Sequence, residues 1–158
     1  MSRGRLVKGK VLITNRSARR DYHVLETLEA GLELKGAEVK SLRQGKGSLA
    51  ASYAVVADGE VWIRDMHITP YDHGSIFNPP EKRPRRLLLH KREIRRLIGQ
   101  TAIKGHTLIP LSVYLSRGLV KLELAVAQGK KLYDKREVLK KREARREMAR
   151  AAEARRRG

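Results

Sequence analysis

The chain has 158 residues, enough for one domain with a single hydrophobic core and an extension. Lys and Arg total 36 against 17 Asp and Glu, a formal charge of +19 that indicates a polyanionic partner such as DNA, RNA or an anionic membrane surface. No apolar run approaches the ~20 residues of a transmembrane helix, zero cysteines exclude disulfides and thiolate metal sites, and residues 1–8 lack the apolar stretch of a signal peptide. A cytosolic (cytoplasmic) location is therefore expected.

The composition changes at Gly129. Residues 1–128 carry 23 basic and 12 acidic groups, net +11, interleaved with apolar strands and turn residues. Residues 129–158 carry 13 basic and 5 acidic groups, net +8, with few large apolar side chains. We therefore predict a folded body over residues 1–128 and a basic C-terminal tail over residues 129–158.

The body is predicted to be mainly β, with six short strands. In chain order these strands cover residues 11–13, 22–34, 54–57, 61–63, 107–115 and 120–126. Asp58-Gly59 is a favoured pair for the tight turn of the first hairpin, and Arg117-Gly118 lies at the turn of the second. In the long second strand, alternation predicts a single apolar face made by Tyr22, Val24, Leu28, Ala30, Leu32 and Leu34. Six strands without long crossover helices favour a closed antiparallel barrel over a parallel α/β sheet.

Two helices interrupt the predicted strands. The first covers residues 37–42. The second begins after His90, has Glu93 at the third position of a capping box, and is expected to end at Gly99. The side chains of this helix expected to face the core are Ile94, Leu97 and Ile98.

Three basic clusters lie in the body. They comprise Arg16, Arg19 and Arg20; Lys40, Arg43 and Lys46; and Lys82, Arg83, Arg85, Arg86, Lys91, Arg92, Arg95 and Arg96. The third favours a phosphate-contacting ridge, with a solvated polar face as the alternative. No zinc-finger spacing, RNP aromatic motif or KH-type glycine loop accompanies the clusters, and aromatic residues are 4% of the chain. Recognition of the backbone and shape of a folded RNA is therefore favoured over base stacking on single strands, and binding should depend steeply on salt.

The tail is rich in Ala, Glu, Lys and Arg, which are strong helix formers. Favourable charge pairs are expected between Glu137 and Lys141, Glu147 and Arg150, and Glu153 and Arg157. Because the tail has no continuous apolar stripe and lone helices are marginal in water, it is expected to be disordered when free and helical among phosphates. The alternative is a solubilising tail or an ordinary solvated helix; scarce large apolar residues argue against membrane insertion.

The sequence shows no catalytic or metal-binding constellation. The five histidines, among them His73, lack metal-ligand spacing and have no Cys to assist them. Residues 43–48 superficially resemble a phosphate loop, but Lys40 and Gly47 stand where a Walker motif needs Gly and Ser or Thr. We therefore expect a binding protein that is not an enzyme, with no metal, no cofactor and no small-molecule substrate.

Five blocks of sequence carry a more specific pattern. They are residues 15–22 (NRSARRDY), 28–43 (LEAGLELKGAEVKSLR), 68–71 (ITPY), 86–93 (RLLLHKRE) and 129–136 (GKKLYDKR). In this order, and over nearly the whole chain, they resemble the SsrA-binding protein family (small protein B). His90 stands where the family commonly has Asn, and Ala144 stands where some members carry a second aromatic residue in the tail.

The resemblance implies an OB-like closed barrel that binds the tRNA-like domain of transfer-messenger RNA (tmRNA) and delivers it to stalled ribosomes for trans-translation. A monomer would bind each RNA and meet elongation factor Tu through it. The tail would then probe the decoding centre and the empty mRNA channel of the small subunit, both lined by 16S rRNA. Two other functions stay open, namely a structural ribosomal protein with a basic extension and an RNA-processing enzyme.

The basic clusters and the resemblance together give a set of expected contact residues. On the body these are Asn15, Arg16, Arg19, Arg20, Glu29, Lys40, Lys46, Arg86, Leu88, His90 and Lys91. Glu29 would accept hydrogen bonds from a base or a ribose hydroxyl, or orient an arginine, with a structural ion pair as the alternative; for Leu88 the alternative is a place in the core. The expected decoding-centre residues are Gly129, Lys130, Lys131, Tyr133, Asp134, Lys135 and Arg136, with Tyr133 stacking on an rRNA base. The expected channel residues are Lys140, Lys141, Arg142, Arg145 and Arg146.

Overall fold

The structure, a computed structural model, describes residues 9–71 and 78–157. Its strands are β1 (Val11–Thr14), β2 (Tyr22–Leu32), β3 (Gly47–Ser48), β4 (Tyr53–Ala57), β5 (Glu60–Arg64), β6 (His67–Ile68), β7 (Arg85–Leu88), β8 (His106–Ser116) and β9 (Leu119–Gly129). Its helices are α1 (Ala18–Asp21), α2 (Gly36–Arg43), α3 (Lys91–Ala102) and α4 (Lys130–Arg157). The basic segment 1–8, His73 and Gly158, considered above, lie outside the described residues.

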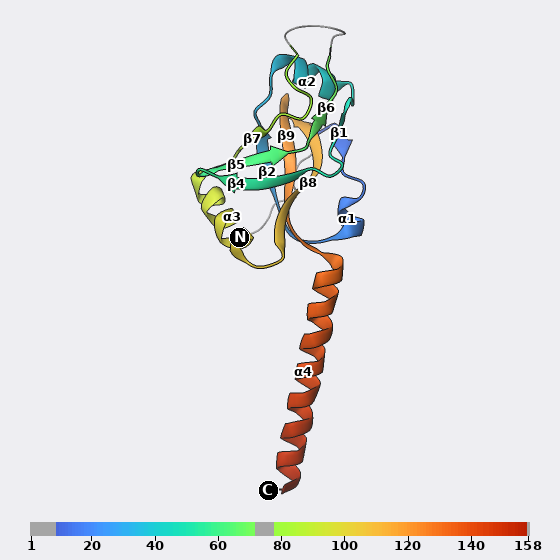
Figure 1. Ribbon diagram of the computed structural model, residues 1–158, viewed down its shortest axis with the longest axis vertical. Coiled ribbons are helices and arrows are strands. Elements are labelled where there is room, and N and C mark those ends of the chain that lie inside the picture. The colour runs from blue at the N-terminus through green and yellow to red at the C-terminus, as the bar shows by residue number, and fades with distance from the viewer. Residues whose placement is uncertain (1–8, 72–77, 158) are drawn as a thin grey trace.

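Six strands pair in a closed ring (Figure 1) in the order β8, β4, β5, β7, β2, β9 and back to β8. Every pairing in the ring is antiparallel. Strand β1 pairs with β8 outside the ring, and β3 pairs with β6 in a separate two-stranded sheet. The prediction of a mainly β fold is confirmed, but the predicted set of ring strands is wrong in one member, because β7 and not β1 completes the ring.

Strand β2 changes faces at Leu25. Its register with β9 shifts between Val24 and Glu26, so that Leu25 is the extra residue of a β-bulge. A one-residue shift turns the following side chains to the opposite face of the sheet. Leu28 and Ala30 therefore pack in the main core inside the ring, whereas Tyr22 and Val24 pack on a second cluster. The predicted single apolar face is wrong for this reason, and β2 ends at Leu32, before Leu34. The second cluster contains Ala18, Ile109, Leu111, Ala125 and Ala127.

Both predicted helices of the body are present, with different ends. In α3 the backbone N–H of His90 donates to the Glu93 carboxylate at 3.0 Å, which confirms the predicted N-terminal cap partner. Ile94 and Leu97 are buried in the main core, but Ile98 is 47% exposed, so its predicted burial is wrong. The helix also continues beyond Gly99 to Ala102, because this glycine does not adopt the left-handed conformation that ends helices.

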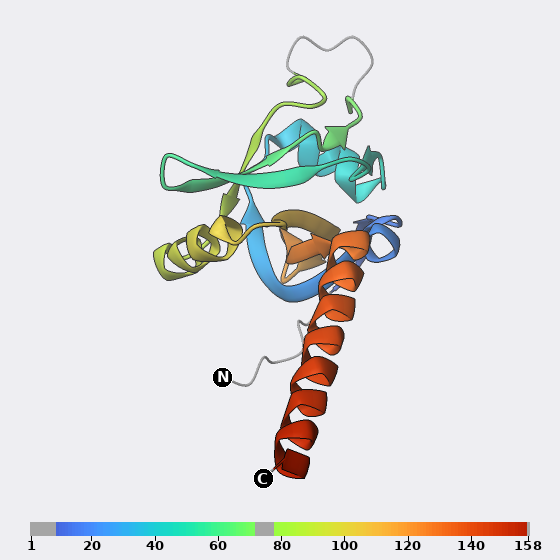
Figure 2. The same cartoon turned by 60° about the horizontal axis from the view of Figure 1, so that its bottom comes forward.

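The tail forms one helix of 28 residues, α4, which starts directly after β9. At 1.5 Å per residue it is about 42 Å long. Figures 1 and 2 show it extending away from the ring, and no residue along it is buried. The expectation that the tail is disordered when free stays a prediction. Within the described residues, no helix combines the length and apolarity that a membrane span requires.

Candidate nucleic-acid interface

The turn between β1 and α1 presents three exposed arginines. Asn15 holds it in place, because its side-chain amide donates to the Pro110 carbonyl at 2.9 Å and its backbone N–H donates to the Leu111 carbonyl at 2.8 Å. Arg16, Arg19 and Arg20 surround this anchor and are all exposed. Arg19 pairs with Glu123 at 3.8 Å and Arg20 with Asp21 at 3.4 Å, and both arginine side chains remain largely exposed. The turn is therefore anchored by Asn15 and presents three exposed arginine side chains.

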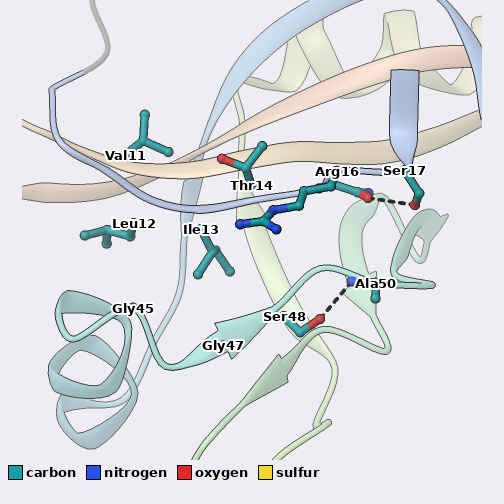
Figure 3. A pocket seen from close by; sticks show the side chains of 11 residues that line it. Val11, Leu12, Ile13, Thr14, Arg16, Ser17, Gly45, Gly47, Ser48 and Ala50 are labelled. Carbon is teal, nitrogen blue, oxygen red and sulfur yellow. Dashed lines mark hydrogen bonds between the residues drawn. The ribbon is translucent and has the colours of Figure 1, made fainter. Parts of the chain in front are cut away.

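A pocket of about 730 Å³ lies between this turn and the segment after α2. Figure 3 shows the Arg16 side chain extending across it, with Gly45, Gly47 and Ser48 on the opposite side. Lys46, between these glycines, is exposed. Of the first two predicted basic clusters only Arg16 lines the pocket, and Lys46 belongs to the segment on its opposite side without lining it. Lys40 does not line the pocket, and its ammonium group lies 5.4 Å from the centroid of the Tyr71 ring.

Glu29 lies on the outer face of β2, beside a second pocket of about 500 Å³ that Arg117 and Lys121 also line. The hydroxyl of Tyr114 donates a hydrogen bond to its carboxylate. Burial of Tyr114, followed by this bond and the negative charges of Glu29 and Glu123, raises the pKa of the Tyr114 phenol well above its ordinary value. Within the described residues Glu29 forms no ion pair. Its carboxylate accepts a hydrogen bond from a tyrosine, and two basic residues line the same pocket.

The predicted ridge from Lys82 to Arg96 is divided by ion pairs. Arg85 is fully buried and bound to Glu38, so its predicted place on the ridge is wrong. Arg83 also binds Glu38, and Arg86 lies 2.7 Å from Glu33. The ridge members that remain exposed are Lys82, Lys91, Arg92, Arg95 and Arg96, the last of which pairs with Glu26 at 2.7 Å.

Two residues between the ridge segments are accessible as expected for contacts. Leu88 is 47% exposed at the end of β7, which excludes the alternative that it is a core residue. His90 and the neighbouring Lys91 are exposed at the start of α3. Because Leu88 lies beside Gly31 of β2, this segment adjoins the strand that carries Glu29.

The root of the tail packs on the body through contacts that the sequence did not reveal. The Tyr133 ring stacks on His23 of β2, with centroids 3.8 Å apart and an interplanar angle of 15°. The Arg136 guanidinium donates to the Lys104 carbonyl at 3.0 Å. Leu132 lies directly over Gly105. His23 and Gly105 gave no signal in the sequence, because nothing local relates them to a segment 25 or more residues away in the chain.

The remaining expected tail residues lie on an exposed helix. Beyond Gly129, which ends β9, they are Lys130, Lys131, Asp134, Lys135, Lys140, Lys141, Arg142, Arg145 and Arg146, all exposed. The predicted pair of Glu153 and Arg157 forms at 3.1 Å. Glu137 pairs with Lys140 at 3.8 Å instead of Lys141, and among the described residues Glu147 makes no salt bridge with Arg150. Most of the basic groups on α4 therefore keep no acidic partner on the helix.

These features define a class of protein. A closed β ring carries an exposed cluster of arginines, and a long cationic helix projects from it. Among the described residues no group of three potential metal ligands gathers. Such an arrangement of fixed and projecting cations is that of a protein that binds nucleic acid through its backbone phosphates.

The comparisons identify the family. The family model described as SmpB protein matches residues 12–154, and the chain belongs to this family. An SsrA-binding protein from Desulforudis audaxviator is 58% identical over 90% of this chain and 94% of its own length. One from Syntrophomonas wolfei is 54% identical over 98% of this chain and 99% of its own. A chain from a solved structure described as "tmRNA-SmpB: a journey to the center of the bacterial ribosome" is 50% identical, with a TM-score of 0.66 over 77% of this chain and 85% of that one.

Proposed function

We propose that this protein binds the tRNA-like domain of tmRNA and delivers it to stalled ribosomes for trans-translation, as an RNA-binding protein without catalysis. Family membership over residues 12–154 carries this proposal, together with the likeness to a chain described with tmRNA and the bacterial ribosome. The exposed charge agrees with it, because cations are available on both the body and the tail.

On the body, we propose that the folded RNA lies across the turn at Arg16, Arg19 and Arg20 and the adjoining pocket. These side chains can reach phosphates, whereas Asn15 supports the turn from beneath. Glu29 offers an acceptor for a base amino group or a 2′-hydroxyl, held in place by Tyr114. The remaining proposed contacts of the body are Lys40, Lys46, Arg86, Leu88, His90 and Lys91.

The ring of six strands is, in this proposal, an OB-like barrel, a fold that commonly binds nucleic acid. The tail would probe the decoding centre with residues 129–136 and the empty mRNA channel with Lys140, Lys141, Arg142, Arg145 and Arg146. Basic side chains around the whole circumference of α4 suit a channel walled by 16S rRNA phosphates. One monomer would act per RNA in the cytoplasm, meeting elongation factor Tu through the RNA.

The division between body and tail supplies the test. A chain truncated after Gly129 keeps β9 complete and removes α4. It should bind a tRNA-like RNA with an acceptor stem and elbow nearly as tightly as the full chain, and should fail to support peptide tagging on ribosomes stalled at the end of a truncated message. Equal affinity of the full chain for a duplex RNA of the same length would refute the proposal. A structural ribosomal protein would instead copurify stoichiometrically with vacant ribosomes.

A further inference from the structure

Three contacts fix the direction in which the tail leaves the body. Tyr133 stacks on His23, Arg136 donates to the Lys104 carbonyl at 3.0 Å, and Leu132 covers Gly105. All three lie within the first two turns of α4, and every residue after Glu137 is exposed. The junction is therefore ordered by specific contacts, and the rest of the helix is free.

The backbone of His23 is held by strand pairing. It pairs with Gln128 in the ladder between β2 and β9, and Gln128 in turn pairs with His106 of β8. Three adjoining strands thus support the backbone beneath the histidine, and the ring lies half-buried at their end. The backbone that carries the His23 ring is therefore fixed, and stacking on that ring limits the side-chain angles of Tyr133.

Tyr133 keeps part of its surface exposed while one face rests on His23. It is the only aromatic residue in 129–158. Among the described residues no other ring stacks on it. Lys130, Lys131 and Arg136 lie on the same two turns and supply positive charge for the phosphates of a nucleotide that approaches it.

We propose that His23 is a positioning residue for Tyr133, holding the tyrosine ring as the inner layer of a stack whose outer layer is an unpaired RNA base. The proposal rests on the proposed function, in which Tyr133 meets rRNA. Stacking on a free side chain would first have to order it, whereas the histidine holds the ring in place before the base arrives. Neither the sequence pattern nor membership of the family assigns such a role to His23.

An opposite role can be separated from this one by the sign of its effect. If the contact with His23 were inhibitory and kept Tyr133 from binding RNA, losing the histidine ring would make the tail engage the ribosome more readily. If His23 positions Tyr133, losing the ring weakens engagement and another flat ring restores it. The two roles therefore predict changes in opposite directions.

The experiment compares His23→Leu, which keeps apolar bulk without a ring, with His23→Phe, which keeps a ring. Each full-length variant is bound to tmRNA at saturation and titrated onto stalled ribosomes, and peptide tagging is measured. We expect His23→Leu to raise the half-maximal concentration roughly threefold to tenfold, the cost of ordering one side chain on binding, and His23→Phe to match the wild type. His67→Leu, which removes a ring on β6 that pairs with Glu81, is the matched control.

A second comparison isolates the pair. In a Tyr133→Leu background, adding His23→Leu should cause no further loss, because the histidine acts only through the tyrosine. The inference is overturned if His23→Leu tags as well as or better than the wild type, if His23→Phe is as poor as His23→Leu, or if the two losses add fully. If the wild type itself supports no peptide tagging, the proposed function is refuted. This outcome is distinct from a failure of the inference about His23, in which the wild type tags peptides and the variants do not differ as expected.

Discussion

The ion cluster at Glu38 offers a direct test of what holds the ring and its helices together. The Glu38 side chain is 2% exposed and that of Arg85 is 0% exposed. Arg85 donates to Glu38 at 2.7 Å and to the Met66 carbonyl at 2.7 Å, and Arg83 also donates to Glu38. The same carboxylate accepts the backbone N–H of Lys35 at 2.9 Å, at the start of α2. One side chain therefore joins α2 to β7.

Replacing Glu38 with Gln should strongly destabilise the fold. Removing one partner of a buried ion pair leaves the other charge buried without compensation, at a cost of about 3–5 kcal/mol. For a domain of this size, a loss of 1 kcal/mol lowers Tm by roughly 2–4 °C, so a fall of about 6–20 °C is expected. The control is Glu33→Gln, because Glu33 also pairs with an arginine, Arg86, at 2.7 Å, but its side chain is 55% exposed. An exposed pair contributes only about 0–1 kcal/mol.

The assay is equilibrium unfolding in urea, followed by the fluorescence of Trp62, the only tryptophan, whose strand pairs with β7.

Burial by itself would raise the pKa of the Glu38 carboxyl, but hydrogen bonds from Arg83, Lys35 and Arg85 and the charge of Arg85 lower it overall. A lowered native pKa gives stability that is complete above the unfolded pKa of about 4.3 and is lost as the pH falls through the native value. The difference in unfolding free energy between wild type and Glu38→Gln should therefore shrink in acid. Equal losses for the two glutamine variants, or a difference independent of pH, would refute this reasoning.

Three further predictions concern the tail, the outer face and the charge. Gly105→Ala should lower the free energy of unfolding by about 1–3 kcal/mol, because φ is +85° and the new Cβ would lie 2.5 Å from Leu132; an unchanged urea midpoint would contradict this. Because the pKa of Tyr114 is raised, stability should fall above the unfolded pKa of about 10, and Tyr114→Phe should flatten that fall in alkaline unfolding curves. Full-length ribosome binding should weaken with salt more steeply than that of a chain truncated after Gly129; parallel slopes would count against phosphate contacts along α4.

The strands that alternate clearly could be predicted from sequence, and the bulge could not. The hairpins around Asp58-Gly59 and Arg117-Gly118 are present, with strand ends within a few residues of those expected. In β2, by contrast, Leu25 and Glu26 interrupt the alternation. From the sequence alone, such an interruption can be either a single mismatched residue or a bulge after which the side chains point to the opposite face of the sheet. Only the pairing with β9 shows that Leu25 is the extra residue.

The strand β7 was missed because it begins with two arginines. Arg85 and Arg86 suggest a solvated segment, since a charged side chain is rarely buried without a partner. The partner of Arg85 is Glu38, 47 residues away in the sequence, and only the folded chain brings them together. For the same reason a run of positive residues could not be divided in advance into structural arginines and those free to bind RNA.

The position of the exposed arginines relative to the tail links the two proposed roles. Figures 1 and 2 both show α1, which carries Arg19 and Arg20, beside the start of α4. An RNA bound at that turn would therefore lie next to the segment where Tyr133 stacks on His23. Because that segment is fixed to β2 and to the loop at Lys104, the direction of the tail follows the orientation of the body. Placing the RNA on the body would thus also aim the helix, so a loosened root should impair ribosome engagement while RNA affinity is retained.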